Sequence, residues 1–369
     1  MSIFALVDVN NFFVSCHRAI QSDLEGLPVV VLSPDGGIII ARSNEAKALG
    51  IKMAEPVFKV KHIIESKKVI CILSNHRLYK DTSQKMMVLF LRHSPKVQEY
   101  SIDEAFLDFT GVQPDHLQKL GHDIKNDIMD TLKIPVCVGF GKTKTLAKLA
   151  NHLAKTLEDL NGVYSFYENE RLRASLGLVP IDQVWGIGTV NAKKLKGDGV
   201  HAALDLASLP LSRVKRRLNL MGQRVYQELN GQVCSPLEIT RSEQKSIMES
   251  RTMVQATSSK EKLKEEIAQH VVNVCEKLRA SGLVSKEICF SISTNSHNKG
   301  PQYDKTAKRS LLAPTNLTKT YLEQAFLLLN EIFKEGYQYK KTGVTISNLE
   351  NEKNTEKDLF IVEDKKQRL

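Results

Sequence analysis

Short apolar runs and amphipathic stretches alternate through the first 168 residues of the chain. IFALVDV, PVVVL and GGIIIA predict strands bounded by Pro or Gly, and NEAKALG predicts a helix that ends at Gly50. The β-rich stretch VQEYSIDEAFLDFTG predicts a hairpin, and the helix DHLQKLGHDIKNDIMDTLK follows it. The strand IPVCVGFG and the lysine-rich helix KTKTLAKLANHLAKTL complete a predicted unit of sheet and helices.

The pattern changes near residue 170 to short helices separated by glycine turns, without a strand pattern. The polar, proline-containing stretch VCSPLEITRSEQK then predicts a linker. Two successive β-α-β patterns follow, with a short strand expected near Ser310, and they predict a small α+β domain. The expected fold class is therefore α+β with several domains.

Length and composition fit this division. A chain of 369 residues exceeds what one hydrophobic core usually supports, and a hydrophobic content of 42% suffices for two or more cores. No secretory signal and no stretch of membrane-spanning length are recognisable, so we expect a cytoplasmic protein without a membrane partner. Six scattered cysteines without a C-x-x-C pair argue against a structural zinc site and a disulfide framework.

The net charge of +10 is unevenly distributed. Residues 1–168 carry 20 basic and 19 acidic side chains, residues 169–244 carry 11 and 7, and residues 245–350 carry 16 and 11. A near-neutral first part joined to basic segments favours a polyanionic partner such as nucleic acid, although solvated helices can carry the same charge.

Three acids stand in apolar surroundings at predicted strand ends. Asp8 ends the first strand, and Asp103 and Glu104 lie at the turn of the hairpin. A single acid at a strand end is usually only solvated, which is how we interpret Asp108. The other three should be partly buried, and burial is costly for carboxylates without compensating cations. If the two strands are neighbours, the three acids meet and are suited to hold two Mg²⁺ ions for phosphoryl transfer.

Five segments together resemble one family in order and spacing: DVNNFFVSCH, ARSNEAKALGIKM, EYSIDEAFLDFTG, VGFGKTKTLAKLANHLAK and VWGIG. They resemble the Y-family of translesion DNA polymerases, and within it the UmuC type, the catalytic subunit of bacterial DNA polymerase V. The resemblance covers residues 1–350 and implies a right-hand polymerase. It implies a palm at 1–18 and 75–168, fingers at 19–74, a helical thumb with a helix-hairpin-helix at 169–240, a β-α-β little finger at 241–350 and a flexible tail at 351–369.

The resemblance assigns roles to the residues of the site. It implies that Asp8, Asp103 and Glu104 are the catalytic, metal-binding acids and that the Val9 carbonyl assists them. Phe13 matches the steric gate, a ring that leaves no room for a ribonucleotide 2′-hydroxyl, while we expect Phe12 to face inward. The residues implied to bind the incoming nucleotide are Asn10, Asn11, Phe12, Phe13, Asn44, Lys47 and Lys155.

Three positions depart from the usual pattern of the family. Asn44 stands where relatives often carry tyrosine, and Lys47 where they often carry arginine, so the contacts to the triphosphate should differ. His17 stands where glutamate is usual, and we interpret it as a surface histidine at a helix start.

The resemblance also suggests DNA and protein contacts. Gly186 and Gly188 allow a tight turn with amides facing a phosphate, and Lys193 and Lys194 follow it. Arg251 is expected along DNA phosphates in the little finger. In the tail, EKDLF resembles a sliding-clamp-binding peptide, with Leu359 and Phe360 as its apolar residues.

The function expected is insertion of dNTPs opposite damaged bases of a primer-template DNA, which is error-prone translesion synthesis in SOS mutagenesis. Two rivals remain: a nucleotide cyclase, which needs no DNA-gripping modules, and a catalytically impaired DNA-binding or regulatory subunit of a polymerase complex. The UmuC-type resemblance further implies a UmuD-type dimer, a RecA filament and the sliding clamp as partners, and association with the bacterial nucleoid when active.

Overall fold

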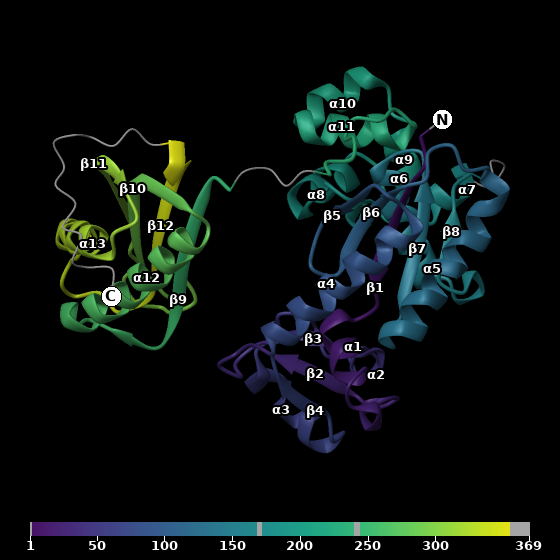
Figure 1. Cartoon of the computed structure of the whole chain (residues 1–369). Coiled ribbons are helices and arrows are strands. Elements are labelled where there is room, and N and C mark those ends of the chain that lie inside the picture. The colour runs from purple at the N-terminus through teal and green to yellow at the C-terminus, as the bar shows by residue number, and fades with distance from the viewer. Residues whose placement is uncertain (1, 168–171, 240–243, 355–369) are drawn as a thin grey trace. The chain divides into compact units, whose positions relative to one another are not determined.

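The computed structural model describes residues 2–167, 172–239 and 244–354. Contacts divide the chain into two compact units, Met1–Arg241 and Ser242–Leu369, each of which is described by itself (Figure 1). No helix among the described residues is long and apolar enough to cross a membrane.

A five-stranded sheet forms the centre of the first unit. Its strand order is β5-β6-β1-β7-β8, so the N-terminal strand lies in the middle. β1 is antiparallel to both of its neighbours. The strands span β1 (Phe4–Val9), β5 (Val97–Glu99), β6 (Glu104–Asp108), β7 (Val136–Gly141) and β8 (Val163–Ser165). β5 and β6 pair as the predicted hairpin.

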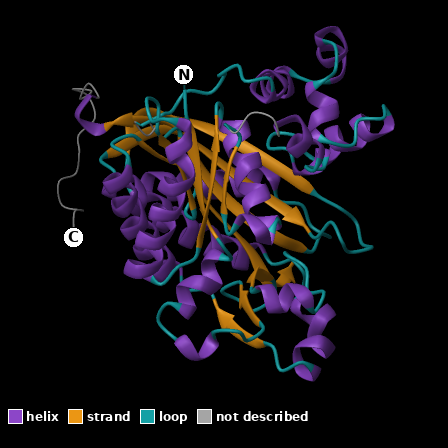
Figure 2. Cartoon of the chain, turned by 90° about the vertical axis from the view of Figure 1, so that its right-hand side faces the viewer, coloured by secondary structure: helices purple, strands orange, loops and turns teal. Residues whose placement is uncertain are grey.

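Helices pack against this sheet (Figure 2). They are α4 (His76–His93), α5 (Leu117–Leu132) and α6 (Lys144–Thr156). α6 approaches β7 closely because Gly139 and Gly141 have no side chains. A Cβ atom on Gly139 would lie 2.0 Å from the backbone nitrogen of Asn151, and one on Gly141 would lie 2.5 Å from that of Ala147. Glycine at these positions therefore fixes the helix against the centre of the sheet.

A second, three-stranded sheet has the order β3-β2-β4. Its strands are β2 (Val29–Leu32), β3 (Ile39–Arg42) and β4 (Ile70–Leu73), and the first two are the predicted ones. The surrounding helices are α1 (Phe12–Arg18), α2 (Asn44–Ala48) and α3 (Val57–Ser66), with a short 3₁₀ turn at Ser22–Leu24. Further 3₁₀ turns lie at Pro114–His116, Glu158–Leu160, Ile181–Gln183 and Glu352–Asn354.

Residues 172–229 are helical, as the pattern predicted. The helices are α7 (Leu172–Gly177), α8 (Thr189–Gly197), α9 (Ala203–Ala207), α10 (Leu211–Arg217) and α11 (Leu220–Leu229). Their apolar residues share one core with Leu146, Leu149 and Leu153 of α6, so this helical segment is anchored on the central sheet's own helix.

The second unit is a four-stranded antiparallel sheet in the order β11-β10-β12-β9. It comprises β9 (Ser246–Thr257), α12 (Lys260–Ala280), β10 (Leu283–Thr294), β11 (Asp304–Thr315), α13 (Thr318–Ile332) and β12 (Tyr339–Asn351), which is the predicted double β-α-β order. The strand near Ser310 is longer than predicted, at 12 residues. It is an edge strand with many exposed polar residues, so its apolar signal is weak.

Candidate active site

Three acids come together at one end of the central sheet. Asp8 on β1 lies directly opposite Glu104 on β6 in the antiparallel register. The backbone nitrogen of Val9 donates to the carbonyl oxygen of Asp103 at 3.0 Å, which holds the turn before β6 against the end of β1. The strands that carry Asp8 and Glu104 are therefore neighbours, which was the condition for the three acids to meet.

The Asp8 carboxylate is in an electrostatically costly position. Its side chain is only 20% exposed. Its pKa is raised to about 6, chiefly by burial and to a lesser extent by the negative charges of Glu104 and Asp103, against the opposing effect of Lys155. A carboxylate with two acidic neighbours in a partly dry site is poised to accept positive charge.

Two lysines of α6 supply part of that charge. Lys155 forms an ion pair with Asp8. Lys148 donates to both carboxylate oxygens of Glu104, at 3.0 and 3.1 Å. The two lysines are seven residues apart, two helical turns, and so share one face of α6. Asp103 instead accepts a hydrogen bond from the hydroxyl of Ser101.

The donor set is that of a hard divalent cation. Carboxylate oxygens are the ligands that Mg²⁺ prefers, and three acids face only two lysines. In the described part of the chain, no three His, Cys, Asp or Glu side chains are grouped closely enough to bind one ion. Asp8 and Glu104 each contact a lysine instead. The residues therefore fit a divalent cation, provided that it replaces the lysines as their partner.

Two phenylalanines begin α1, next to the acids. Phe12 is 4% exposed and belongs to the core, the inward orientation that we expected. Phe13 is half-buried, and its ring stacks on Tyr79 of α4 with centroids 4.1 Å apart. The interpretation of His17 as a surface residue at a helix start is wrong. His17 lies in the last turn of α1, is 6% exposed and hydrogen-bonds the Tyr79 hydroxyl at 2.9 Å.

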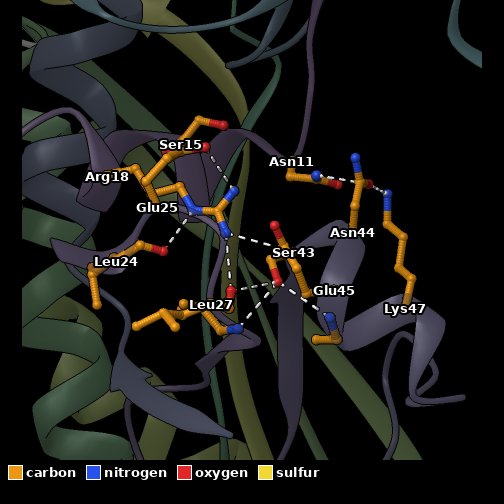
Figure 3. Close-up of polar contacts among 12 residues, drawn as sticks. Asn11, Ser15, Arg18, Leu24, Glu25, Leu27, Ser43, Asn44, Glu45 and Lys47 are labelled. Carbon is orange, nitrogen blue, oxygen red and sulfur yellow. Dashed lines mark hydrogen bonds and ion pairs between the residues drawn. The ribbon is translucent and has the colours of Figure 1, made fainter. Parts of the chain in front are cut away.

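Asn11 links α1 to α2 (Figure 3). Its backbone adopts a left-handed conformation with φ 51°, and its amide donates to the side-chain oxygen of Asn44 at 3.0 Å. Lys47 donates to the same oxygen at 3.2 Å. Burial lowers the pKa of Lys47, and the positive charges of Arg42 and Lys155 lower it further. Asn44 therefore connects the residues of NNFF to a cluster of cations.

Backbone pairing fixes the two residues between Asp8 and Asn11. Val9 is 2% exposed and lies opposite Val136 on β7. Asn10 donates its backbone N–H to the carbonyl oxygen of Pro135 at 2.9 Å, and its own carbonyl accepts from the Ser15 hydroxyl at 2.6 Å.

The glycine hairpin around Gly186 precedes α8. Gly186 has φ +84°, and a Cβ there would lie 2.8 Å from Val225, so glycine is required for both conformation and space. Gly188 caps α8 without a side-chain hydrogen bond to its first amides, which leaves them available for an anion. Lys193 and Lys194 are exposed on α8.

The remaining predicted contacts lie elsewhere. Arg251 is exposed on β9 of the second unit, opposite Thr342 on β12. Leu359 and Phe360 fall outside the described residues.

Several residues of the site were not found from the sequence. Lys148 could have been found, since it lies two helical turns before Lys155. Tyr100 and Trp185 lie in the quoted segments EYSIDEAFLDFTG and VWGIG, but nothing local indicates that their rings meet Lys148, and Tyr79 reaches the site from the separate helix α4. Tyr100 and Trp185 surround the Lys148 ammonium, and the ring of Tyr79 supports Phe13.

Comparisons with known proteins identify the family. The sequence model of the impB/mucB/samB family matches residues 7–152, and that of its C-terminal domain matches residues 244–359. The chain is 35% identical over 361 residues to protein UmuC of Salmonella typhimurium, covering 97% of this chain and 86% of UmuC. The chain belongs to the impB/mucB/samB family of Y-family DNA polymerases.

Other members of this Y-family give a consistent picture. Protein MucB of Escherichia coli is 32% identical over 360 residues, covering 97% of this chain and 85% of MucB. A solved Y-family DNA polymerase chimera matches with a TM-score of 0.79 at 22% identity, covering 94% of this chain and 99% of that one. This chain therefore has the right-hand polymerase fold. Y-family polymerases are nucleotidyltransferases that require divalent metal ions.

Proposed function

We propose that this chain inserts deoxynucleotides opposite damaged template bases, using Asp8, Asp103 and Glu104 to hold two Mg²⁺ ions. The enzyme class is DNA-directed DNA polymerase, acting in translesion synthesis. The observation that carries the proposed site is the strand register, which sets Asp8 opposite Glu104 beside the turn that contains Asp103.

The acids have the chemistry that nucleotidyl transfer needs. Bound divalent cations would stabilise negative charge on the primer oxygen and neutralise part of the negative charge on the phosphates of the nucleotide. Asp8 is held on the central strand, with neighbours on both sides, so its position is set by backbone pairing. Backbone pairing thus fixes the strand positions of the acids, and binding of a cation requires only that their side chains exchange the lysines for the metal.

The surrounding residues are suited to the nucleotide. Lys155 and Lys47 supply positive charge for the triphosphate, and Asn11 is held beside Lys47 through Asn44. Phe13 is the proposed steric gate, with its ring stacked on Tyr79. Stacking fixes the ring plane, which a gate against the 2′-hydroxyl requires. The hydrogen bond that the Asn11 side-chain amide donates to Asn44, in place of an aromatic contact, makes this triphosphate site more polar.

We assign DNA binding to two parts of the chain, and propose the palm, fingers, thumb and little-finger boundaries stated above. The amides before α8, with Lys193 and Lys194, are suited to backbone phosphates without reading bases. Arg251 lies on an exposed strand surface in the second unit. Backbone contacts of this type suit an enzyme that must accept any template sequence.

Partners and location are inferred from the relatives alone. The similarity to protein UmuC supports a UmuD-type dimer and a RecA filament as partners, and a cytoplasmic location at the bacterial nucleoid. Leu359 and Phe360 are proposed to bind the sliding clamp through two apolar side chains in a charged segment.

Primer extension tests the proposed function. Wild-type chain should extend a primer in the presence of Mg²⁺, on undamaged template and past an abasic site. Asp103→Ala and Glu104→Ala should each lower the rate by about a hundredfold or more, because catalytic electrostatic groups are typically worth that much. Asp108→Ala is the matched control: it is an acid on the same strand, paired with Lys96 away from the site, and should retain synthesis.

The outcomes separate the remaining alternatives. An impaired regulatory subunit would bind primer-template but would not extend it, even at high Mg²⁺. Synthesis that persists unchanged in both alanine variants would overturn the assignment of the acids. Synthesis that stops at the abasic site would instead contradict lesion bypass.

A further inference from the structure

Lys148 has surroundings that set it apart from an ordinary surface lysine. Its side chain is 19% exposed, and its partner Glu104 is 12% exposed. The ammonium lies 4.4 Å from the ring centroid of Tyr100 and 5.5 Å from that of Trp185. Two rings and a bidentate carboxylate therefore hold one cation in a partly dry site.

The rings connect Lys148 to a separate element. Tyr100 lies in the turn between β5 and β6, three residues before Asp103. Trp185 immediately precedes Gly186 of the hairpin and donates its indole N–H to the Tyr100 hydroxyl at 3.0 Å. The two rings are in edge contact, with centroids 5.7 Å apart. The hairpin before α8 is thus joined to Glu104 through three side chains in sequence.

Asp8 and Glu104 each contact a different lysine of α6. Lys155 pairs with Asp8, is 30% exposed and lies near Lys47, among groups that suit a triphosphate. Lys148 instead contacts Glu104 and the rings of Tyr100 and Trp185. Its geometry serves the carboxylate, since a cation held by both oxygens fixes the carboxylate plane.

We propose that Lys148 is a positioning residue for Glu104, a resident counter-charge that a divalent cation displaces, and that Tyr100 and Trp185 transmit this exchange to the hairpin before α8. The inference rests on the proposed metal-binding role of Glu104. When the cation binds, Glu104 turns from Lys148 to the metal, and the ammonium stays against the two rings. Loss of its carboxylate partner changes the charge beside Trp185.

Trp185 is the single tryptophan of the chain, so tryptophan emission reports on its surroundings, which include the Lys148 ammonium and the ring of Tyr100. Adding Mn²⁺ to the full-length chain without DNA should change the emission in a saturable way. Lys148→Gln should abolish that response. In the same samples, free Mn²⁺ measured by electron paramagnetic resonance gives the affinity. We expect tighter binding in Lys148→Gln, by about fivefold or more, because a positive charge 3.0 Å from the nearest carboxylate oxygen no longer opposes the cation.

Matched variants separate charge from packing. Lys148→Arg keeps the charge and should retain the wild-type Mn²⁺ affinity and an emission response. Lys119→Gln removes one exposed lysine of α5 and should change neither. In a Glu104→Gln background, Lys148→Gln should have no further effect, because the carboxylate that couples the two is gone. If Lys148→Gln does not fold, Lys148→Met keeps the stem against the rings and replaces it.

Two results would overturn the inference: wild-type Mn²⁺ affinity in Lys148→Gln, or an arginine variant that behaves like the glutamine variant. Either would mean that Lys148 only packs against the rings. Primer extension by the wild type and its loss in Asp103→Ala decide the proposed function separately. If the chain extends primers but its Mn²⁺ affinity does not depend on Lys148, the proposed function holds and the proposed role of Lys148 is wrong.

Discussion

Asp8 shows, at the scale of one residue, how a site can oppose the stability of its fold. Its pKa of about 6 lies above the ordinary value of 3.8, because burial and the two acidic neighbours disfavour the charged form more than Lys155 favours it. A raised pKa means that the folded chain holds the proton more tightly than the unfolded chain. The ionised carboxylate therefore costs stability above pH 6, and this cost disappears below pH 4.

Asp8→Asn should accordingly stabilise the metal-free protein at pH 7.5, by about 1–2 kcal/mol, while the gain shrinks toward zero at pH 4.5. Denaturant unfolding at the two pH values measures it. Asp108→Asn is the opposite control. Burial raises the pKa of Asp108 less than its hydrogen bonds with Thr110 and its pairing with Lys96 lower it, so the substitution should cost stability at pH 7.5. A loss of stability in Asp8→Asn at pH 7.5 would contradict this account.

The sequence revealed the acids but not their partners. Asp8, Asp103 and Glu104 were recognisable because each is polar within an apolar run. The lysines that pair with these acids were harder to recognise. The rotation of α6 about its axis, which its close packing on Gly139 and Gly141 fixes, decides which lysine contacts which acid. His17 was misjudged for a related reason: only the buried hydroxyl of Tyr79, 62 residues away, makes its burial acceptable.

Between elements, a single carboxylate joins α11 to the first turn of α6. Glu228 is 1% exposed, and one of its oxygens accepts from the backbone nitrogen and the hydroxyl of Thr145, at 3.0 and 2.6 Å. The other accepts from the backbone nitrogens of Cys234 and Ser235. The negative charge thus caps the N-terminus of the helix that carries Lys148 and Lys155. It orients the active-site helix and the helical segment together.

Glu228→Gln should lower the free energy of unfolding by about 2–4 kcal/mol, because a buried amide cannot accept all four hydrogen bonds. Urea unfolding monitored by Trp185 fluorescence measures it. Glu65→Gln is the control, since Glu65 forms only an exposed ion pair with Lys61 and should change stability by about 0.5 kcal/mol or less. Equal stability of the two variants would mean that Glu228 does not join the helices.

Element order was predictable where strand and helix periodicities, which are local properties, are strong, whereas α3, α4, β4 and β8 were not predicted. The hairpin of β5 and β6 and the double β-α-β order of the second unit followed from pattern alone. Sheet order was not predictable in this way. The placement of β1 between β6 and β7 depends on pairing across about a hundred residues, which no local pattern encodes.

At the scale of the whole molecule, the second unit has a core of its own. Its fully buried side chains include Phe290, Tyr321 and Tyr339, and its core draws on residues from 247 to 346 only. Residues 244–354 expressed alone should therefore unfold cooperatively, with a heat-capacity change on the scale of about 1.5 kcal/mol/K. Calorimetry measures it. A gradual transition without a heat-absorption peak would mean that this unit depends on the first one.

The central position of β1 also governs when the site can exist. The strand that carries Asp8 is synthesised before its partners β6 and β7, which comprise residues 104–108 and 136–141. Such distant pairing forms late, after both partner strands have left the ribosome. A chain interrupted before residue 136 lacks β7, the strand that pairs with β1 on the side opposite Glu104. We therefore expect products cleaved before β7 to lack polymerase activity, which would confine translesion synthesis to chains with a complete sheet.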